Sequence, residues 1–207
     1  MARTLPRSFY ARPALEVAPE LLNKVLRADD GRSARIVEVE AYVGEGVDAA
    51  SHAFRGETPR NRVMFGPPGH LYVYFTYGMH WCANAVCERP GTAEAVLLRA
   101  GAPLDGSALI RQARGPKPAD RDLLRGPARL AQGMGIGAAD NGADLVGGRL
   151  RILDDGTAPP DVVACGPRVG ISVATDLPWR YWVPGDRNVS GRVTALRSTP
   201  PEGRSTP

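Results

Sequence analysis

The stretch VEVEAYVG, at residues 37–44, carries side chains that could do acid–base chemistry. Successive side chains of an extended strand point to opposite faces, so Glu38, Glu40 and Tyr42 share one face. A carboxylate on such a face could be a general base that takes a proton from water. Two other interpretations stay open, a two-carboxylate glycosidase and a carboxylate paired with arginine at a sheet edge. Side-by-side carboxylates do not flank a bond, which disfavours the glycosidase.

A second stretch, HLYVYFTYGMHW at residues 70–81, is rich in aromatic residues, although only 6% of the chain is aromatic. Tyr72 and Tyr74 are most simply explained as hydrophobic packing. Tyr77 precedes a glycine at the turn between two predicted strands, where a large ring cannot belong to the core. His52, in ASHAFRG, is by itself more typical of a structural hydrogen-bond donor than of a catalyst.

Cysteine usage and charge bound the classes of protein that fit. Cys82, Cys87 and Cys165 make an odd number without an apolar signal segment, which indicates reduced thiols in a cytosol. His80 lies near two of these cysteines, but no second ligand pair follows, so we expect no metal and no cofactor. No apolar stretch approaches the length of a membrane span.

The net charge of +4 suggests a polyanionic partner without proving one. Of the 26 basic residues, only Lys24 and Lys117 are lysines. Codon bias is the simplest explanation of this composition. Either way, chemistry that needs a lysine amine has two candidates in the chain.

Periodicity and turn residues predict one α+β domain with a curved, mostly antiparallel sheet, helices around it and a protruding hairpin. We place the domain at residues 1–195 and a flexible tail at 196–207. Helices are expected at 14–26, 104–114 and 120–136, the last broken at Gly126-Pro127, where main-chain amides could seat a phosphate. Strands are expected at 33–44, 71–77, 79–86, 94–100, 149–153, 168–173 and 180–183, with a long loop at 44–70.

Alternation also assigns the faces of two strands. In strand 33–44, Val37 and Val39 would face the core together with Ala41 and Val43, while Ile36 would share the face of the glutamates. Strand 94–100 would place Leu97 and Arg99 on one face, and Val96 and Leu98 on the other.

Several motifs occur in a specific order and spacing. They are EAY, ASH, TPRN, MF, PG, LYVY and YGM, followed by AVLLRA, LIRQAR, GPARL and RVGI. Over residues 15–185 this series resembles the alkyladenine DNA glycosylase family, the 3-methyladenine DNA glycosylases of the human and Gram-positive bacterial type. The resemblance implies a fold like the C-terminal domain of methionyl-tRNA formyltransferase. It also implies a cytoplasmic, nucleoid-associated monomer that removes alkylated purines, flipped out of double-stranded DNA, by hydrolysis of the N-glycosidic bond.

The same resemblance implies roles for individual residues. Glu40 would be the base that activates water, which Arg99 and the main-chain carbonyl of Val169 would help to hold. The flipped base would lie between Tyr42 and Tyr74. The remaining base-binding residues would be His52, Asn84 and Leu97, and DNA would be contacted by Tyr77, Met64, Arg60, Arg114 and Arg129.

The expected substrates are 3-methyladenine and 7-methylguanine, with ethenoadenine and hypoxanthine as further candidates. Neither Lys24 nor Lys117 adjoins these site residues in sequence, so we predict an enzyme that uses water and does not cut the strand. A lesion-binding or RNA-binding module without chemistry is an alternative. A hydrolase of free nucleosides is a weaker one, because the basic loops and Tyr77 suit a polymer.

Overall fold

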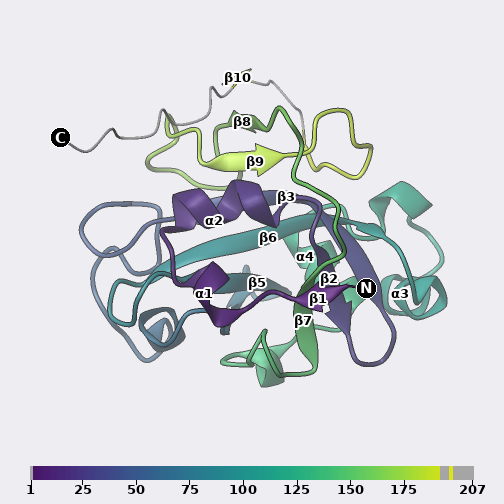
Figure 1. The fold of residues 1–207 in the computed structure, drawn as a ribbon, viewed down its shortest axis with the longest axis horizontal. Helices are drawn as coiled ribbons and strands as arrows, with labels where there is room; N and C mark the ends of the chain where they lie inside the picture. Colours follow the sequence, from purple (N-terminus) through teal and green to yellow (C-terminus); the bar gives the residue numbers. More distant parts are fainter. Residues whose placement is uncertain (1, 192–195, 198–207) are drawn as a thin grey trace.

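A curled sheet dominates the computed structural model, which describes residues 2–191 and 196–197 (Figure 1). Neighbouring strands pair in the order β1-β7-β2-β3-β6-β5-β4, while β9 joins β3 to β8 and β8 pairs with β10. Every ladder between these strands is antiparallel. The strands are β1 (Arg3–Thr4), β2 (Val25–Ala28), β3 (Ser33–Tyr42), β4 (Leu71–Thr76), β5 (His80–Cys87), β6 (Glu94–Pro103), β7 (Leu150–Asp154), β8 (Ala164–Gly166), β9 (Arg180–Trp182) and β10 (Leu196–Arg197).

Helices in the described residues are few and short, so they cover the sheet only in part and do not surround it. The main core cluster combines apolar side chains from the sheet with Val17 and Leu21 of α2 and with Leu130 and Met134 of α4. Figure 1 shows α2 lying across β3 and β6. The α-helices are α1 (Arg7–Tyr10), α2 (Ala14–Leu21), α3 (Ser107–Arg114) and α4 (Pro127–Met134), and the 3-10 turns are η1 (Arg62–Phe65), η2 (Asp120–Asp122) and η3 (Ala138–Asp140).

The helix expected at 14–26 is too long. It ends at Leu21, because Leu22 is extended and Asn23 has a φ of 67°. Val25 and Leu26 instead pair with β3 and β7. A short apolar run does not by itself distinguish a buried strand from a helix, and here long-range pairing decides.

Strand β3 is the centre of the sheet, and a bulge divides it. Its register with β6 skips Val37 on β3 and Arg99 on β6. On its other side β3 pairs first with β2 and then, beyond the bulge, with β9. Ile36 therefore packs in the main core with Val39, while Val37 packs in a separate cluster with Trp182. The predicted assignment of Ile36 and Val37 was wrong, because a bulge breaks the period of two.

The predicted hairpin is confirmed, with β4 and β5 joined at Tyr77-Gly78. Tyr77 has a φ of 52° and Gly78 a φ of 63°, and the N–H of Met79 donates to the carbonyl of Thr76. Two central residues with positive φ are typical of a type I′ turn, which favours Asn-Gly. A tyrosine at the first position is therefore strained, and its side chain is 78% exposed.

The second half of the chain confirms most of the expected elements. Helices α3 and α4 and strands β6, β7 and β9 lie where they were expected, and α4 begins after Gly126. The strand expected at 168–173 was wrong: β8 lies earlier, and residues 168–173 form a loop. Of the expected tail, Leu196 and Arg197 pair with β8, and the rest lies outside the described residues, as does the predicted boundary at 195.

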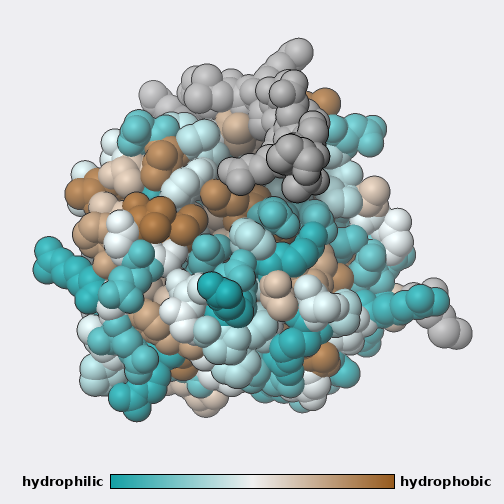
Figure 2. All heavy atoms as spheres, turned by 60° about the vertical axis from the view of Figure 1, so that its left-hand side comes forward, coloured by the Kyte–Doolittle hydropathy of each residue, from teal (hydrophilic) through white to brown (hydrophobic). Residues whose placement is uncertain are grey.

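One face of the molecule is mostly hydrophilic, with hydrophobic side chains gathered in smaller groups (Figure 2). In the part of the chain that the structure describes, no helix is long and apolar enough to cross a membrane.

Candidate active site

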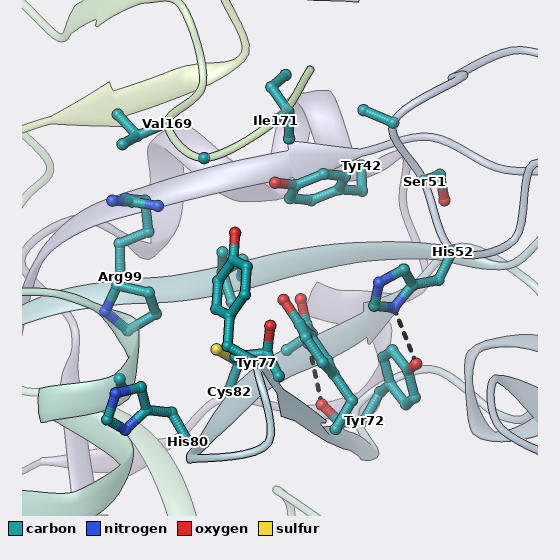
Figure 3. A pocket seen from close by; sticks show the side chains of 18 of the residues that line it. Tyr42, Ser51, His52, Tyr72, Tyr77, His80, Cys82, Arg99, Val169 and Ile171 are labelled. Atoms are coloured by element: carbon teal, nitrogen blue, oxygen red, sulfur yellow. Dashed lines mark hydrogen bonds between the residues drawn. The ribbon is translucent and has the colours of Figure 1, made fainter. Parts of the chain in front are cut away.

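A cavity of about 590 Å³ opens beside the β4–β5 hairpin (Figure 3). Its walls come from the end of β3, from β4, β5 and β6, from η1, from the loops at 49–52 and 169–173, and from the first residues of α4. This volume suits a ligand of the size of a nucleobase or larger. The predicted site residues that line it are Tyr42, His52, Met64, Tyr74, Tyr77, Asn84, Leu97, Arg99 and Val169.

Glu40 is fully buried and lies against residues of the cavity wall. Its Oε1 accepts a hydrogen bond from the Val169 main-chain N–H at 2.7 Å, and its Oε2 accepts one from the Tyr42 hydroxyl at 2.9 Å. Nη1 of Arg99 forms an ion pair with Oε1 at 3.2 Å. The carboxylate thus contacts three groups that line the cavity, while Glu40 itself does not.

Burial raises the pKa of Glu40 above its ordinary value of 4.5, and the charge of Glu38 adds to this. Arg99, the Val169 amide and the Tyr42 hydroxyl oppose the rise, because each favours the ionised form. A carboxylate whose pKa lies closer to neutrality is a better proton acceptor than an exposed one. Glu40 therefore has the environment of a general base.

Arg99 is aimed at the glutamates by the bulge in β6. Because the register skips it, Arg99 has no direct partner across the β3–β6 ladder. Bulges commonly redirect a side chain beside a functional site. Its guanidinium contacts both Glu38 and Glu40. Burial alone would lower the pKa of Arg99, but the two carboxylates outweigh it and raise the pKa, so the side chain stays charged.

Rings form the opposite part of the wall. His52 and Tyr74 meet edge to face, with ring centroids 4.5 Å apart, and Tyr74 stacks on Tyr72 at 5.5 Å. Nδ1 of His52 lies 3.0 Å from the Tyr72 hydroxyl (Figure 3). Burial, and then the charge of Arg60, lower the pKa of His52, so its ring is neutral near pH 7. Tyr72 is thus part of the site, because it lines the cavity and contacts His52, whereas its residue type alone predicts only packing.

Arg168 is another residue of the site that the sequence pattern did not reveal. Its side chain and that of Asp48 are both fully buried and form a two-point ion pair. The guanidinium also donates to the carbonyl of Ala41 and lies 4.5 Å from the centroid of the Tyr42 ring. The pair therefore fixes the loop that precedes Val169 against the end of β3.

Asn84 projects into the cavity from the same strand face as His80 and Cys82, as alternation predicted. Its Nδ2 donates to the main-chain carbonyl of Tyr72 at 3.0 Å, so the orientation of the amide is fixed. Leu97 and Arg99 share the cavity face of β6, while Val96 and Leu98 pack in the core, which confirms that assignment.

The predicted DNA-contacting residues differ in their surroundings. Tyr77 stands at the mouth of the cavity (Figure 3). Arg60 lies beside strand β4, with its guanidinium 5.8 Å from the centroid of the Tyr74 ring. Arg129 is half-exposed near Asp122.

Two of the predicted contacts are less accessible. Arg114 donates to the main-chain carbonyl of Leu123 and to Gln132 of the protein itself. Met64 is only 3% exposed, and it packs beside Tyr72 in a small apolar cluster. Its place is therefore in the cavity wall and not on the outer surface.

Both lysines lie outside the cavity wall. The expected helix at 14–26 would contain Lys24, but α2 ends at Leu21 and Lys24 follows it. The ammonium of Lys24 pairs with Asp154 of β7 at 2.9 Å. Within residues 2–191 and 196–197, no group of three or more His, Cys, Asp or Glu side chains could hold a metal ion.

Comparisons with known proteins identify the family. A family model described as methylpurine-DNA glycosylase matches residues 8–187. A protein of Burkholderia lata is 62% identical over 192 residues, which cover 92% of each chain. A protein of Leifsonia xyli is 50% identical over 89% of this chain and 90% of its own. A protein of Chlorobaculum parvum is 48% identical over 91% of each chain. All three bear the name "Putative 3-methyladenine DNA glycosylase". The chain therefore belongs to the methylpurine-DNA glycosylase family, whose enzymes are hydrolases of the N-glycosidic bond.

Proposed function

We propose that this protein excises alkylated purines from duplex DNA, with Glu40 as the general base. The observation that carries the proposal is the buried Glu40 carboxylate, which touches Tyr42, Arg99 and Val169 at the wall of a cavity of nucleobase size. A protein that only binds lesions has no need for a carboxylate at this position, because burying it costs free energy.

In the reaction, the oxygen of a water molecule attacks C1′ of the sugar while Glu40 takes a proton from that water. The bond between C1′ and the purine nitrogen breaks, and its electron pair leaves with the base. A carboxylate also stabilises positive charge that develops on the sugar. Both oxygens of Glu40 already accept a hydrogen bond, Oε1 from the Val169 amide and Oε2 from the Tyr42 hydroxyl, so the water must share one of these oxygens or replace one of these donors. Besides Glu40, the main-chain carbonyl of Val169 would also hold the attacking water.

Recognition of the base would rely on the rings of Tyr42 and Tyr74. Stacking contributes about 1–3 kcal/mol per base. A positively charged alkylpurine adds a cation–π contribution of about 0.5–2 kcal/mol, which favours damaged over normal bases. We propose that Asn84 disfavours guanine by crowding its exocyclic amine, that His52 meets the edge of the base and that Leu97 completes the floor.

Binding of the duplex would use the charged rim of the cavity. Arg60 beside the hairpin and Arg129 on α4 are placed to contact phosphates, and Arg114 would do so after giving up an internal hydrogen bond. Pro127 and Ala128 at the start of α4 line the cavity, which supports a phosphate near this helix end. Met64 would support the loop that faces the DNA. A monomer associated with the nucleoid, and a fold like the formyltransferase C-terminal domain, remain parts of this proposal.

The first test uses duplex DNA with a single ethenoadenine or 7-methylguanine. We expect strand breaks only after alkali, because a monofunctional enzyme leaves an intact abasic site. Borohydride should trap no covalent complex, since Lys24 is engaged by Asp154 and neither lysine lines the cavity. A trapped complex, or breaks without alkali, would refute the monofunctional mechanism. Absence of any base release from all lesions would refute the proposed function.

The pH dependence offers a second test. Below the pKa of Glu40 the carboxyl is protonated and cannot accept a proton, so the excision rate should fall as the pH falls. Because burial raises this pKa, the midpoint should lie above 4.5. Single-turnover rates on 7-methylguanine below neutral pH measure this, because that base is cationic there. A flat profile down to pH 4.5 would contradict a general base whose pKa is raised by burial.

A further inference from the structure

Glu38 is a buried carboxylate, at the centre of a cluster of charged side chains, that the reaction proposed above does not use. Glu38 is fully buried, and its Oε1 accepts hydrogen bonds from Nε of Arg99 at 2.9 Å and Nε of Arg180 at 2.7 Å. Its Oε2 accepts from the main-chain N–H of Ser190 at 2.6 Å, and the Ser190 hydroxyl lies 3.0 Å from Oε1. This carboxylate therefore has four donors around it and no access to the cavity.

The same cluster orients Arg99. Nε of Arg99 donates to Glu38, and Nη2 donates to the Ser190 hydroxyl at 3.1 Å. The remaining nitrogen, Nη1, is the one that pairs with Glu40. An arginine presents its donors in a rigid planar fork, so fixing two nitrogens determines where the third one points.

Such a cluster is not the cheapest way to fill a core. Burying ions costs more than burying apolar side chains of similar volume, unless each charge is paired and hydrogen-bonded. Here two carboxylates face two guanidinium groups from β3, β6 and β9, at the bulge where β3 exchanges β2 for β9. Full satisfaction of Glu38 makes the cluster rigid, which suits a positioning role.

We propose that Glu38 is a positioning residue for base excision: through Arg99, and with Ser190 and Arg180, it holds the guanidinium against Glu40. The inference rests on the proposed function, because it assigns Glu38 to the reaction of Glu40. Glu38 does not touch the substrate.

The charge of Glu38 also gives a signature that packing alone would not produce. Its negative charge is one of the causes that raise the pKa of Glu40, after the larger effect of burial. Glu38→Gln removes that charge, which by itself lowers the pKa of Glu40, but it also releases Arg99, whose opposite effect on this pKa is the larger one. If Glu38 positions Arg99, the pKa of Glu40 should therefore rise and the acid limb of the rate profile should move to higher pH. The other charged or titratable groups that act on Glu40 are Arg99, Tyr42, Tyr74, Cys82 and Arg168.

The experiment compares Glu38→Gln with Asp140→Asn in single-turnover excision across pH. Asp140 is a matched control, because it is also a buried carboxylate paired with an arginine, Arg149, and it does not line the cavity. We expect Glu38→Gln to lower the plateau rate by about 10- to 100-fold, the usual cost of a lost charged hydrogen bond. Its acid limb should shift to higher pH, whereas Asp140→Asn should keep the wild-type rate and limb. A limb that shifts to lower pH would show that Arg99 keeps its place without Glu38 and would contradict the inference.

Two further outcomes would overturn the inference. The first is an active wild type with a Glu38→Gln profile that coincides with that of Asp140→Asn. If Glu38→Gln does not fold, Ser190→Ala decides, since it keeps the charge of Glu38 and removes one contact of Arg99. We expect a rate several-fold lower than that of the wild type. The second outcome that would overturn the inference is a Ser190→Ala rate equal to that of the wild type. If the wild type itself releases no base, the proposed function fails. That result differs from failure of the inference alone, in which the wild type is active.

Discussion

Glu40→Gln is expected to abolish base excision while leaving lesion binding intact. The substitution keeps the size of the side chain and an oxygen that can accept from the Val169 amide. It removes the ability to take a proton from water, which general bases contribute at about 10²- to 10⁴-fold in rate. Single-turnover excision of one lesion in a duplex measures the loss, and a gel shift measures binding by the same protein.

Glu94→Gln is the control for Glu40→Gln. Burial also raises the pKa of Glu94, and its carboxylate accepts a short hydrogen bond from the main-chain N–H of Ala14. Glu94 lies at the start of β6 and does not line the cavity. We therefore expect normal excision from this variant. If Glu40→Gln were as active as Glu94→Gln, the proposed mechanism would be wrong.

Tyr77→Asn is expected to stabilise the protein and weaken its hold on lesions. Asn adopts positive φ more readily than Tyr, and it precedes a glycine in a type I′ turn. The gain in the free energy of unfolding should be roughly 1 kcal/mol, or a rise in Tm of about 2–4 °C. The ring would be lost as a wedge that fills the gap left by the flipped nucleotide. Since stacking is worth about 1–3 kcal/mol, lesion affinity should fall about 10- to 100-fold.

Val47→Ser is the control for Tyr77→Asn, because Val47 is another exposed apolar residue, 67% accessible, and does not line the cavity. Its lesion affinity should match that of the wild type. At saturating enzyme, Tyr77→Asn should lose much less single-turnover rate than Glu40→Gln, since the wedge acts on flipping and not on hydrolysis. Equal losses in the two variants, or unchanged affinity in Tyr77→Asn, would contradict this division of roles.

Local pattern accounts for much of the fold. The hairpin turn, strand β6 and the restart of α4 at Pro127 all follow from alternation and from glycine and proline positions. The errors have a common cause, which is competition between local pattern and distant pairing. Residues 168–173 alternate like a strand, yet Arg168 is held by Asp48, 120 positions away, and Val169 donates to Glu40, 129 positions away. Residues 25 and 26 continue a helical pattern, yet they pair with β3 and β7 in the sheet.

Tyr72 illustrates what a residue type alone does not reveal. Its aromatic ring is buried, as packing predicts, but its hydroxyl contacts His52 of the loop at 49–52, which lines the cavity. That hydrogen bond depends on the path of the intervening loop, where Asn61 donates to the main-chain carbonyls of His52 and Gly56. No periodicity encodes such a path.

The sequence by itself determined the chemical groups of the site and the strand face that carries Glu38 and Glu40, because side chains two positions apart on a strand lie on the same side. Motif spacing also indicated the family. Only the tertiary structure separated the two glutamates. Glu38 is saturated by partners 61, 142 and 152 positions away in the chain. Glu40 is left against the cavity wall. Contacts over such distances arise when the sheet curls and β9 pairs with β3, and no local pattern records them.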